Sequence, residues 1–434
     1  MQMTLDDWLS RLESQHPVAI DLGLDRVRAV ADRLDLAERP LARRVIVVAG
    51  TNGKGSTVAM LERLARAHGH TTASYTSPHL IRYNERLCFD GVPASDEVLV
   101  TAFERVDAAR LAGDPVSLTY FETGTLAALH AIAERAPDLA ILEVGLGGRL
   151  DAVNVIDSDV AVITTIAHDH ADFLGNDLEG IGREKAGILR QGRPAVLGSR
   201  SLPVSVSARI AELEVSDYWL GQAFERDDTP AGGWRWRGED ASGRPLVLDE
   251  LPDPGLPLDN AAVALQSLAL CGFELCPEAT REAFATVSLA GRMQWLGQWC
   301  FDVAHNPHAA TYVASRLAAR SRPARRIGLL GVLDNKDAEA LVMALAPAID
   351  LWLPVGLAGP RGRSSENLAA CVERAGGEIV RQAASPAAGV AGLMPLLTAE
   401  DEVLVCGSFF TVAEALGAVE AIRSGDRDAP DRQA

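Results

Sequence analysis

Positive charge is scarce in this chain of 434 residues. Its 41 Lys and Arg residues are outnumbered by 59 Asp and Glu residues, which gives a formal net charge of −18. Such a surface repels a nucleic-acid backbone, so we expect no nucleic-acid partner. A local nest of backbone amides can still bind a small anion such as phosphate on an acidic protein.

Long apolar runs and paired cysteines are missing as well. No apolar stretch is long enough to span a membrane, and the acidic residues 1–7 lack the basic-then-apolar order of a signal peptide. The six cysteines are scattered and none forms a C-x-x-C pair, so disulfide staples are not expected. We therefore expect a cytoplasmic protein with reduced thiols and no membrane partner. We also expect a monomer, although these observations do not bear on the oligomeric state.

The composition is otherwise that of an ordinary globular protein, with 48% hydrophobic and only 5% aromatic residues. At roughly 150 residues per domain, the length predicts two or three domains. Short apolar strands alternate with helices in two blocks, a pattern typical of parallel sheets in α/β proteins. We place the junction near Val287–Arg292, which gives domains over residues 1–290 and 291–434.

The predicted elements follow from these alternations. In the first block we expect strands at 44–49, 138–143, 159–166 and 194–198, with helices at 56–68, 123–135, 178–189 and 258–270. Residues 200–257 are rich in Gly, Pro and Trp and predict a small antiparallel excursion. In the second block we expect strands at 299–303, 326–331, 351–355 and 403–406, a weaker strand at 378–380, and a last helix at 411–422.

A glycine-rich turn joins the first strand to a helix. It consists of Gly50, Thr51, Asn52, Gly53, Lys54, Gly55, Ser56 and Thr57. Its glycines let several backbone N–H groups point at phosphate oxygens, the helix N-terminus adds its positive dipole end, and the lysine adds a full charge. The strict G-x-x-x-x-G-K-[ST] pattern is not met, because position 48 is Val and Gly55 follows Lys54. We interpret the turn as an ATP-binding P-loop, with an unliganded βα turn as the alternative.

Three further side chains are candidates for metal chemistry. Glu143 ends an apolar strand, where open α/β sheets place their chemistry, and its carboxylate suits Mg²⁺. His170 follows the next strand, and the residues alone leave open whether it is a metal ligand or a core histidine. Lys185 lies on a predicted helix, and by itself a lone lysine is most simply a solvated surface charge.

The P-loop and several other stretches resemble the folylpolyglutamate synthases, relatives of the Mur peptide ligases. The glycine after Lys54 favours the folate branch. The match is nearest to the bacterial enzymes that act as both dihydrofolate synthase and folylpolyglutamate synthase. The other matching stretches are Ser77–Leu80, Leu118–Glu122, Glu143–Ala152, His168–His170, Arg183–Ile188, Phe301–His308 and Cys406–Phe409.

The resemblance implies an ATP-dependent amide ligase with a P-loop NTPase-like N-terminal domain and a smaller Rossmann-like C-terminal domain. ATP would phosphorylate a carboxylate, and L-glutamate would attack the acyl phosphate. The acceptors would be 7,8-dihydropteroate and then tetrahydrofolates, which gain further γ-linked glutamates. Mg²⁺ would be the cofactor, and Lys185 would be carbamylated.

The resemblance also assigns residues to roles. Mg²⁺ would be held by Ser77, Glu143 and His170. Beyond the P-loop, ATP would contact Asn260, Arg292 and Asp302. The catalytic residues would be Lys54, Lys185 and His305. The acceptor and glutamate would contact Asp21, Leu22, Gly23, Leu24, Thr119, Tyr120, Phe121, Glu122, Leu150, Asp151, Ala152, His305 and Ser408. From the residues alone, helix capping for Asn260, a linker ion pair for Arg292 and core packing for Phe121 remain open.

Two other classes are weighed against this one. A Mur-type ligase of nucleotide-linked cell-wall precursors is opposed by Gly55 and by the apparent lack of a separate uridine-nucleotide domain. A P-loop nucleotide switch would carry the guanine-specificity motif N-K-x-D. The nearest stretch, Asn335–Ala338, ends in Ala and lies in the wrong domain.

Overall fold

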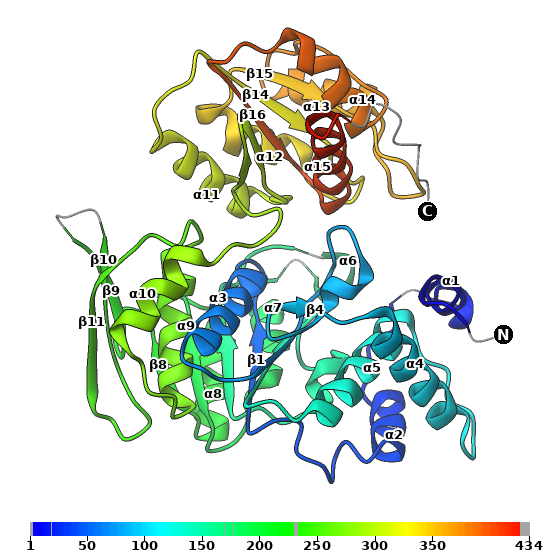
Figure 1. Ribbon diagram of the computed structural model, residues 1–434, viewed down its shortest axis with the longest axis vertical. Coiled ribbons are helices and arrows are strands. Elements are labelled where there is room, and N and C mark those ends of the chain that lie inside the picture. Colours follow the sequence, from blue (N-terminus) through cyan, green and yellow to red (C-terminus); the bar gives the residue numbers. More distant parts are fainter. Residues whose placement is uncertain (1–2, 19, 170, 176, 230–232, 426–434) are drawn as a thin grey trace. The chain divides into compact units, whose positions relative to one another are not determined.

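The chain folds into two compact units. The computed structural model describes residues 3–18, 20–169, 171–175, 177–229 and 233–425 (Figure 1). One unit spans Met1–Val287 and the other spans Ser288–Ala434. The first residue of the junction segment expected from the sequence, Val287, is the last residue of the first unit. Within the described residues, no helix is both long and apolar enough to cross a membrane.

An eight-stranded sheet organises the first unit. Its strand order is β4-β3-β2-β5-β1-β6-β7-β8. The six strands from β2 to β8 in this order run parallel, whereas β3 and β4 are antiparallel at one edge. The bounds are β1 Arg44–Ala49, β2 Thr72–Tyr75, β3 Leu87–Phe89, β4 Val92–Pro93, β5 Leu139–Glu143, β6 Val160–Ile163, β7 Pro194–Leu197 and β8 Ser216–Trp219.

The central strands are apolar because helices cover the sheet. Every residue of β5 and β6 is buried, and in β1 only Arg44 is exposed. Such continuous burial is typical of parallel strands covered on both faces. The helices are α1 Leu5–Gln15, α2 Asp25–Arg33, α3 Lys54–Ala67, α4 Asp96–Leu111, α5 Tyr120–Arg135, α6 Ala171–Leu174, α7 Leu178–Lys185, α8 Val204–Leu213, α9 Leu258–Leu270 and α10 Pro277–Thr286, with 3₁₀ turns η1 Tyr83–Arg86, η2 Ala152–Val155 and η3 Ala186–Ile188.

The antiparallel excursion expected within residues 200–257 is present but shorter than that range. It is a three-stranded sheet in the order β11-β10-β9, built from β9 Glu225–Asp228, β10 Trp234–Glu239 and β11 Pro245–Leu251. The first part of the range instead forms α8 and β8, which extend the main sheet in parallel. Trp234 and Trp236 lie on the buried face of β10, where they pack rather than line a ligand pocket.

The second unit contains a smaller sheet in the order β12-β13-β16-β14-β15. Four strands are parallel and β12 is antiparallel at the edge. The strands are β12 Gln294–Leu296, β13 Trp299–Phe301, β14 Arg325–Leu330, β15 Leu351–Pro354 and β16 Asp401–Cys406. The helices are α11 Pro307–Ala318, α12 Ala338–Leu345, α13 Ser365–Arg374, α14 Pro386–Leu393 and α15 Phe409–Arg423, with 3₁₀ turns η4 Ala346–Ala348 and η5 Met394–Leu396.

Several predicted elements differ from the structure. The helix expected at 178–189 ends as α7 at Lys185 and is followed by the 3₁₀ turn η3, and the strand expected at 159–166 is limited to Val160–Ile163. The strand expected at Glu378–Val380 is only an isolated bridge between Ile379 and Trp352, followed by another between Ala383 and Val355. The two bridges are three residues apart in the segment from Trp352 to Val355 but four residues apart in the segment from Ile379 to Ala383, so no continuous ladder of hydrogen bonds forms. The helix expected from Thr123 begins at Tyr120, because Thr119 and Glu122 form a capping box.

Candidate active site

The carboxyl ends of neighbouring strands carry several of the predicted site residues of the first unit. The strands β2, β5, β1 and β6 are adjacent in the sheet. The P-loop follows β1, Glu143 ends β5, and Ser77 lies two residues after β2. Because parallel strands end at the same edge of a sheet, side chains distant in sequence meet there. The Ser77 backbone N–H lies 3.4 Å from Glu143 Oε2.

The P-loop needs glycine at two positions because other chain segments approach it closely. Gly50 has a φ of 148°, and a Cβ atom there would lie 1.8 Å from Thr164 Oγ1. Gly53 has a φ of 90°, and its Cβ would lie 2.6 Å from Asn260 Nδ2. Both φ values lie where side chains are strained. The glycines therefore allow the loop to curl tightly against β6 and α9.

Two threonines after β6 hold the P-loop and were not identified from the sequence. Thr164 Oγ1 donates to the Asn52 carbonyl at 2.7 Å, and Thr165 Oγ1 donates to the same carbonyl at 3.1 Å. The Asn52 N–H donates back to Thr165 Oγ1 at 3.2 Å, and the Thr51 N–H donates to the Thr165 carbonyl at 2.7 Å. The paired threonines at a strand end were the available signal, but the sequence does not show which loop they face.

Asn260 fixes the P-loop from α9. Its side chain is 4% exposed, and its Nδ2 donates to Ser56 Oγ at 2.8 Å. Ser56 Oγ in turn donates to the Gly53 carbonyl at 3.0 Å. No side chain caps α9, whose N-cap residue is Pro257, so the capping alternative for Asn260 is wrong. The amide links the two helices that begin at this place.

We expect Asn260→Ala to raise the KM for ATP by about tenfold, the scale for losing one hydrogen bond that orders a phosphate loop. A matched control is Gln266→Ala, which removes a second buried amide of the same helix that bonds to Glu239. This control should lower the melting temperature and leave the KM for ATP unchanged. If the KM for ATP were the same in both variants, Asn260 would stabilise the fold without contributing to ATP binding.

Two of the chain's three lysines donate to one carbonyl oxygen. Lys54 Nζ lies 3.0 Å from the Gly50 oxygen and 3.3 Å from the Thr51 oxygen. Lys185 Nζ lies 2.9 Å from the same Gly50 oxygen. The surface alternative for Lys185 is therefore wrong, because this residue is 5% exposed and reaches the P-loop from the end of α7.

Burial and the neighbouring Lys54 charge lower the pKa of Lys185 from 10.5 to about 7. Desolvation is the larger cause, and Asp169 and Asp151 oppose it. A substantial fraction of Lys185 is thus a neutral amine near neutral pH. A neutral amine is the form that reacts as a nucleophile with an electrophile such as CO₂.

The predicted metal ligands are only partly described by the structure. Glu143 is 5% exposed at the end of β5, and Ser77 lies beside it. His170 lies outside the described residues. Among the described residues no group of three or more His, Cys, Asp and Glu side chains is arranged to hold a metal ion. Glu143 and Ser77 offer hard oxygen donors, the chemistry that suits Mg²⁺ or Mn²⁺.

The glycine-rich turn after β5 packs against α5 and α7. A Cβ on Gly145 would lie 2.5 Å from Phe121 Cζ, so the ring of Phe121 lies on the turn. A Cβ on Gly148 would lie 2.8 Å from the Glu184 carbonyl oxygen. These close approaches bring the ring of Phe121 and the end of the Lys185 helix to the same turn.

Asp151 orders the end of that turn from within. It is 2% exposed, and its carboxylate accepts from the backbone N–H groups of Leu146 at 2.8 Å and Val153 at 3.1 Å. Burial raises its pKa to about 6, with these hydrogen bonds and the Lys54 charge opposing the shift. Leu150 and Ala152 flank it in the chain. Asp151 therefore positions the backbone around the Phe121 ring.

The other predicted acceptor residues meet through Arg26, which sequence reasoning missed. Arg26 lies 2.8 Å from Asp21 Oδ2 and 2.9 Å from Glu122 Oε1. Glu122 also accepts from the Thr119 N–H at 2.8 Å, so its carboxylate is fully engaged. Leu22, Gly23 and Leu24 form the link from Asp21 to α2.

Three of the four predicted residues of the second unit, Asp302, His305 and Ser408, follow the ends of β13 and β16, and Arg292 precedes β12. Asp302 is buried, accepts from the Met293 and Ala304 N–H groups at 2.9 Å each, and has a pKa raised by desolvation. His305 Nδ1 lies 3.0 Å from the Val303 carbonyl oxygen. The Arg292 guanidinium lies 5.2 Å from the centroid of the Phe409 ring.

Ser408 is the N-cap of α15. Its hydroxyl accepts from the Thr411 N–H at 3.0 Å and lies 2.7 Å from Thr411 Oγ1. The residue as a whole is 3% exposed. Capping, the ordinary function of serine at this place, accounts for these bonds.

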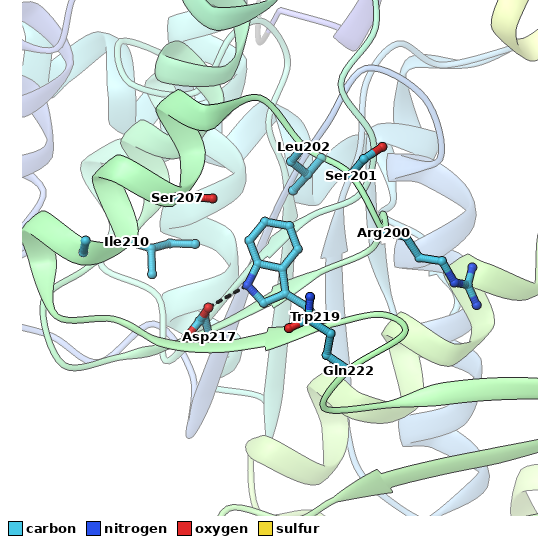
Figure 2. A pocket seen from close by; sticks show the side chains of 9 residues that line it. Arg200, Ser201, Leu202, Ser207, Ile210, Asp217, Trp219 and Gln222 are labelled. Atoms are coloured by element: carbon cyan, nitrogen blue, oxygen red, sulfur yellow. Dashed lines mark hydrogen bonds between the residues drawn. The ribbon is translucent and has the colours of Figure 1, made fainter.

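A pocket of about 540 Å³ lies away from these residues, over α8 and β8. Figure 2 shows the Trp219 ring between Leu202 and Asp217, and its indole N–H donates to Asp217 at 2.6 Å. None of the predicted site residues lines this pocket. This pocket is therefore not the site that the sequence predicts.

Comparison with known proteins agrees with this geometry. Residues 48–197 match the Mur ligase middle domain, and residues 291–409 match the glutamate ligase domain of Mur ligases. The dihydrofolate synthase/folylpolyglutamate synthase of Escherichia coli (strain K12) is 42% identical over 426 residues, which cover 98% of this chain and 97% of that protein.

Solved structures show the same likeness over both units. E. coli FolC in complex with DHPP and ADP has a TM-score of 0.90 and 41% identity, covering 97% of this chain and 99% of that one. A bifunctional folylpolyglutamate synthase/dihydrofolate synthase with Mn, AMPPNP and L-glutamate bound has a TM-score of 0.88 and 41% identity, covering 96% and 98%.

The P-loop sheet and the second sheet unit thus define an ATP-dependent ligase of the Mur type. Within this class the chain belongs to the family of the dihydrofolate synthases/folylpolyglutamate synthases. The cell-wall ligase and the nucleotide switch are not supported. Asp337 in the Asn335–Ala338 stretch caps α12, accepting from the Ala340 N–H at 2.9 Å.

Proposed function

We propose that this ligase joins L-glutamate first to 7,8-dihydropteroate, forming dihydrofolate, and then to tetrahydrofolates as γ-linked chains. The observation that carries the proposal is the P-loop held between β6 and α9, with Lys54 at its tip and Glu143 at the adjoining strand end. Full-length relatives with both activities in their names support the choice of substrates.

The P-loop residues Gly50–Thr57 bind the ATP phosphates in this proposal. Lys54 leaves the Gly50 and Thr51 oxygens and donates to the phosphates, which places a full charge where negative charge is transferred. Asn260 holds the loop in position. Arg292 and Asp302 of the second unit provide the remaining nucleotide contacts, with the carboxylate of Asp302 accepting from ribose hydroxyls.

A divalent cation bound by Ser77, Glu143 and His170 would neutralise phosphate charge during transfer. The acceptor carboxylate attacks the terminal phosphorus, ADP leaves, and the glutamate amine then displaces phosphate from the acyl phosphate. His305 and Ser408 are the proposed glutamate contacts. The likeness to a structure with Mn, AMPPNP and L-glutamate bound supports these assignments.

The two units divide the work in this proposal. Residues 1–290 bind the ATP phosphates and the folate acceptor, and residues 291–434 bind glutamate and add the nucleotide contacts of Arg292 and Asp302. The pterin lies on the Phe121 ring, because Phe121 offers a flat apolar face beside the turn that Asp151 orders. The residues Asp21–Leu24, Thr119–Glu122 and Leu150–Ala152 form the surroundings of that ring.

Carbamylation of Lys185 is part of the same proposal. The neutral Lys185 amine adds CO₂ and releases one proton, so an uncharged group beside Lys54 becomes a carboxylate. The short distance of both Nζ atoms to the Gly50 oxygen supports this step, because two ammonium groups on one carbonyl repel each other. The resulting carboxylate attracts Lys54 and the metal.

One assay tests the substrates directly. Purified protein is incubated with ATP, Mg²⁺ and L-glutamate, and offered 7,8-dihydropteroate or tetrahydrofolate, with product masses measured. We expect a single glutamate addition to dihydropteroate and successive additions to tetrahydrofolate. Absence of product with both acceptors, together with ATP hydrolysis by the protein alone, would contradict the proposal.

A substitution at Asp151 tests the acceptor site. We expect Asp151→Ala to raise the KM for 7,8-dihydropteroate at least about tenfold, because two buried N–H groups lose their acceptor and the turn under the pterin loosens. The affinity for AMPPNP, measured by calorimetry, should change less than about threefold, within the range of an indirect effect. Weaker nucleotide binding with unchanged acceptor KM would show that the pterin site lies elsewhere.

A further inference from the structure

Arg86 lies beside the strand end that carries Ser77. The Thr76 N–H, one residue before Ser77, donates to the Arg86 carbonyl at 2.8 Å. This bond continues the antiparallel pairing of β2 with β3, in which Tyr75 faces Leu87. The backbone of Arg86 is thereby fixed one residue away from a proposed metal ligand.

Aromatic rings and a histidine hold the side chain of Arg86. Its Cζ lies 5.1 Å from the Tyr83 ring centroid and 5.6 Å from the Tyr120 ring centroid. Its Nε donates to His79 Nδ1 at 2.9 Å. Tyr120 is the first residue of α5 and directly precedes Phe121, the proposed pterin contact. The guanidinium is therefore positioned beside the proposed acceptor site.

No carboxylate pairs with this guanidinium among the residues that the structure describes. The adjacent Glu85 carboxylate accepts instead from the backbone N–H groups of Leu80, Ile81 and Arg82. Arg82 pairs with Asp96 at 3.4 Å, and Arg26 pairs with two acids. A half-buried guanidinium without a counter-charge is unusual in a chain with an excess of 18 acids over bases.

The contact with His79 adds a second donor. Because His79 Nδ1 accepts a hydrogen bond, its imidazole is neutral and carries its proton on Nε2. The pair thus presents the terminal N–H groups of Arg86 and one imidazole N–H, and no acceptor for an incoming cation. A guanidinium in this setting binds a carboxylate with two parallel hydrogen bonds.

We propose that Arg86 binds the α-carboxylate of the glutamyl residue on a tetrahydrofolate acceptor. This inference rests on the proposed function. Dihydropteroate has a single carboxylate, and that group reacts. Tetrahydrofolate reacts through its γ-carboxylate and keeps the α-carboxylate, a second negative charge that a cationic side chain can bind. Arg86 supplies the unpaired cation that only the second acceptor needs, so it serves chain extension rather than the first addition.

Variants of Arg86 test this selectivity. Arg86→Met keeps an unbranched stem between the two tyrosine rings and removes the charge, and Arg86→Lys keeps the charge without the planar fork. We expect Arg86→Met to raise the KM for tetrahydrofolate by about 10- to 100-fold, the range for losing a charge-assisted pair. The KM for 7,8-dihydropteroate should stay within about threefold, the range of an indirect effect, and Arg86→Lys should recover part of the loss. Arg82→Met, on the same segment, should leave both values unchanged.

An altered acceptor tests the same contact without changing the protein. We expect the wild-type enzyme to use tetrahydrofolate bearing an α-carboxamide as poorly as Arg86→Met uses tetrahydrofolate, and the two changes should not add. An equal increase in KM for both acceptors in Arg86→Met would overturn the inference. Full wild-type activity with the α-carboxamide would also overturn it, and this second test does not depend on the stability of any variant. Wild-type inactivity with both natural acceptors would instead contradict the proposed function.

Discussion

Lys54→Ala is expected to lower turnover by at least about 100-fold, the scale for losing one preorganised charged donor in a phosphate site. Among the described residues Lys54 Nζ donates to the oxygens of Gly50 and Thr51, both within its own loop, so we expect the core to be unaffected. The melting temperature should therefore fall by only a few degrees. Product formation from 7,8-dihydropteroate, ATP and glutamate measures the effect.

The chain provides a matched control for this variant. The remaining lysine of the sequence, Lys336, lies in the second unit before α12 and has no role in the proposed reaction. Lys336→Ala should retain full turnover. Normal turnover in Lys54→Ala would remove ATP from the P-loop and with it the proposed phosphoryl transfer.

Lys185 gives the second large effect. We expect Lys185→Ala to lose most activity, because no carboxylate can then form at the P-loop, and to regain part of it with added short-chain carboxylates. Electron density or ¹³C NMR with ¹³CO₂ should show the carbamate on Lys185 in the active enzyme. A high-resolution structure of the active enzyme with an unmodified Lys185 amine would contradict this prediction.

The pH dependence of activation follows from the lowered pKa. Carbamylation needs the neutral amine, and Lys185 loses its proton as the pH rises through about 7. Enzyme freed of CO₂ at pH 6 should regain activity faster at pH 8 than at pH 6 when the dissolved CO₂ concentration is held the same at both pH values. A reactivation rate that does not change between these values would show that the amine is not the reacting group.

The lowered pKa of Lys185 also predicts how protein stability depends on pH. Replacing Lys185 should remove activity without lowering the free energy of unfolding. Between pH 7 and 10.5 the unfolded chain protonates Lys185 while the unmodified folded chain does not. The free energy of unfolding therefore rises with pH in this window, and below it the buried charge is a cost. Lys185→Met should be at least as stable as the CO₂-free wild type at pH 6 by thermal unfolding, which separates folding from catalysis.

Local patterns in the sequence were sufficient for the elements that bury continuous apolar stretches. The strand 44–49 and the helix 258–270 have the bounds that their apolar patterns predict. Both elements are buried along almost their whole length, so the apolar stretch and the element coincide. The predictions were wrong for two reasons: one element depends on a partner distant in the sequence, and in the other a local capping motif was overlooked. The 378–380 segment pairs only around Trp352, and α5 gained its first turn from the capping box of Thr119 and Glu122.

The sequence by itself determined the family, the P-loop and the candidate roles, because the motif chemistry is local: glycines, a lysine and a helix start lie within eight residues. Only the tertiary structure decided what holds that loop. Thr164 and Asn260 lie more than 100 residues from it, and Lys185 reaches the Gly50 oxygen across 135 positions. Sheet order β2-β5-β1-β6 brings these segments to one edge. Burial at that edge then sets the pKa of Lys185, a property that depends on packing and so cannot be read from neighbouring residues.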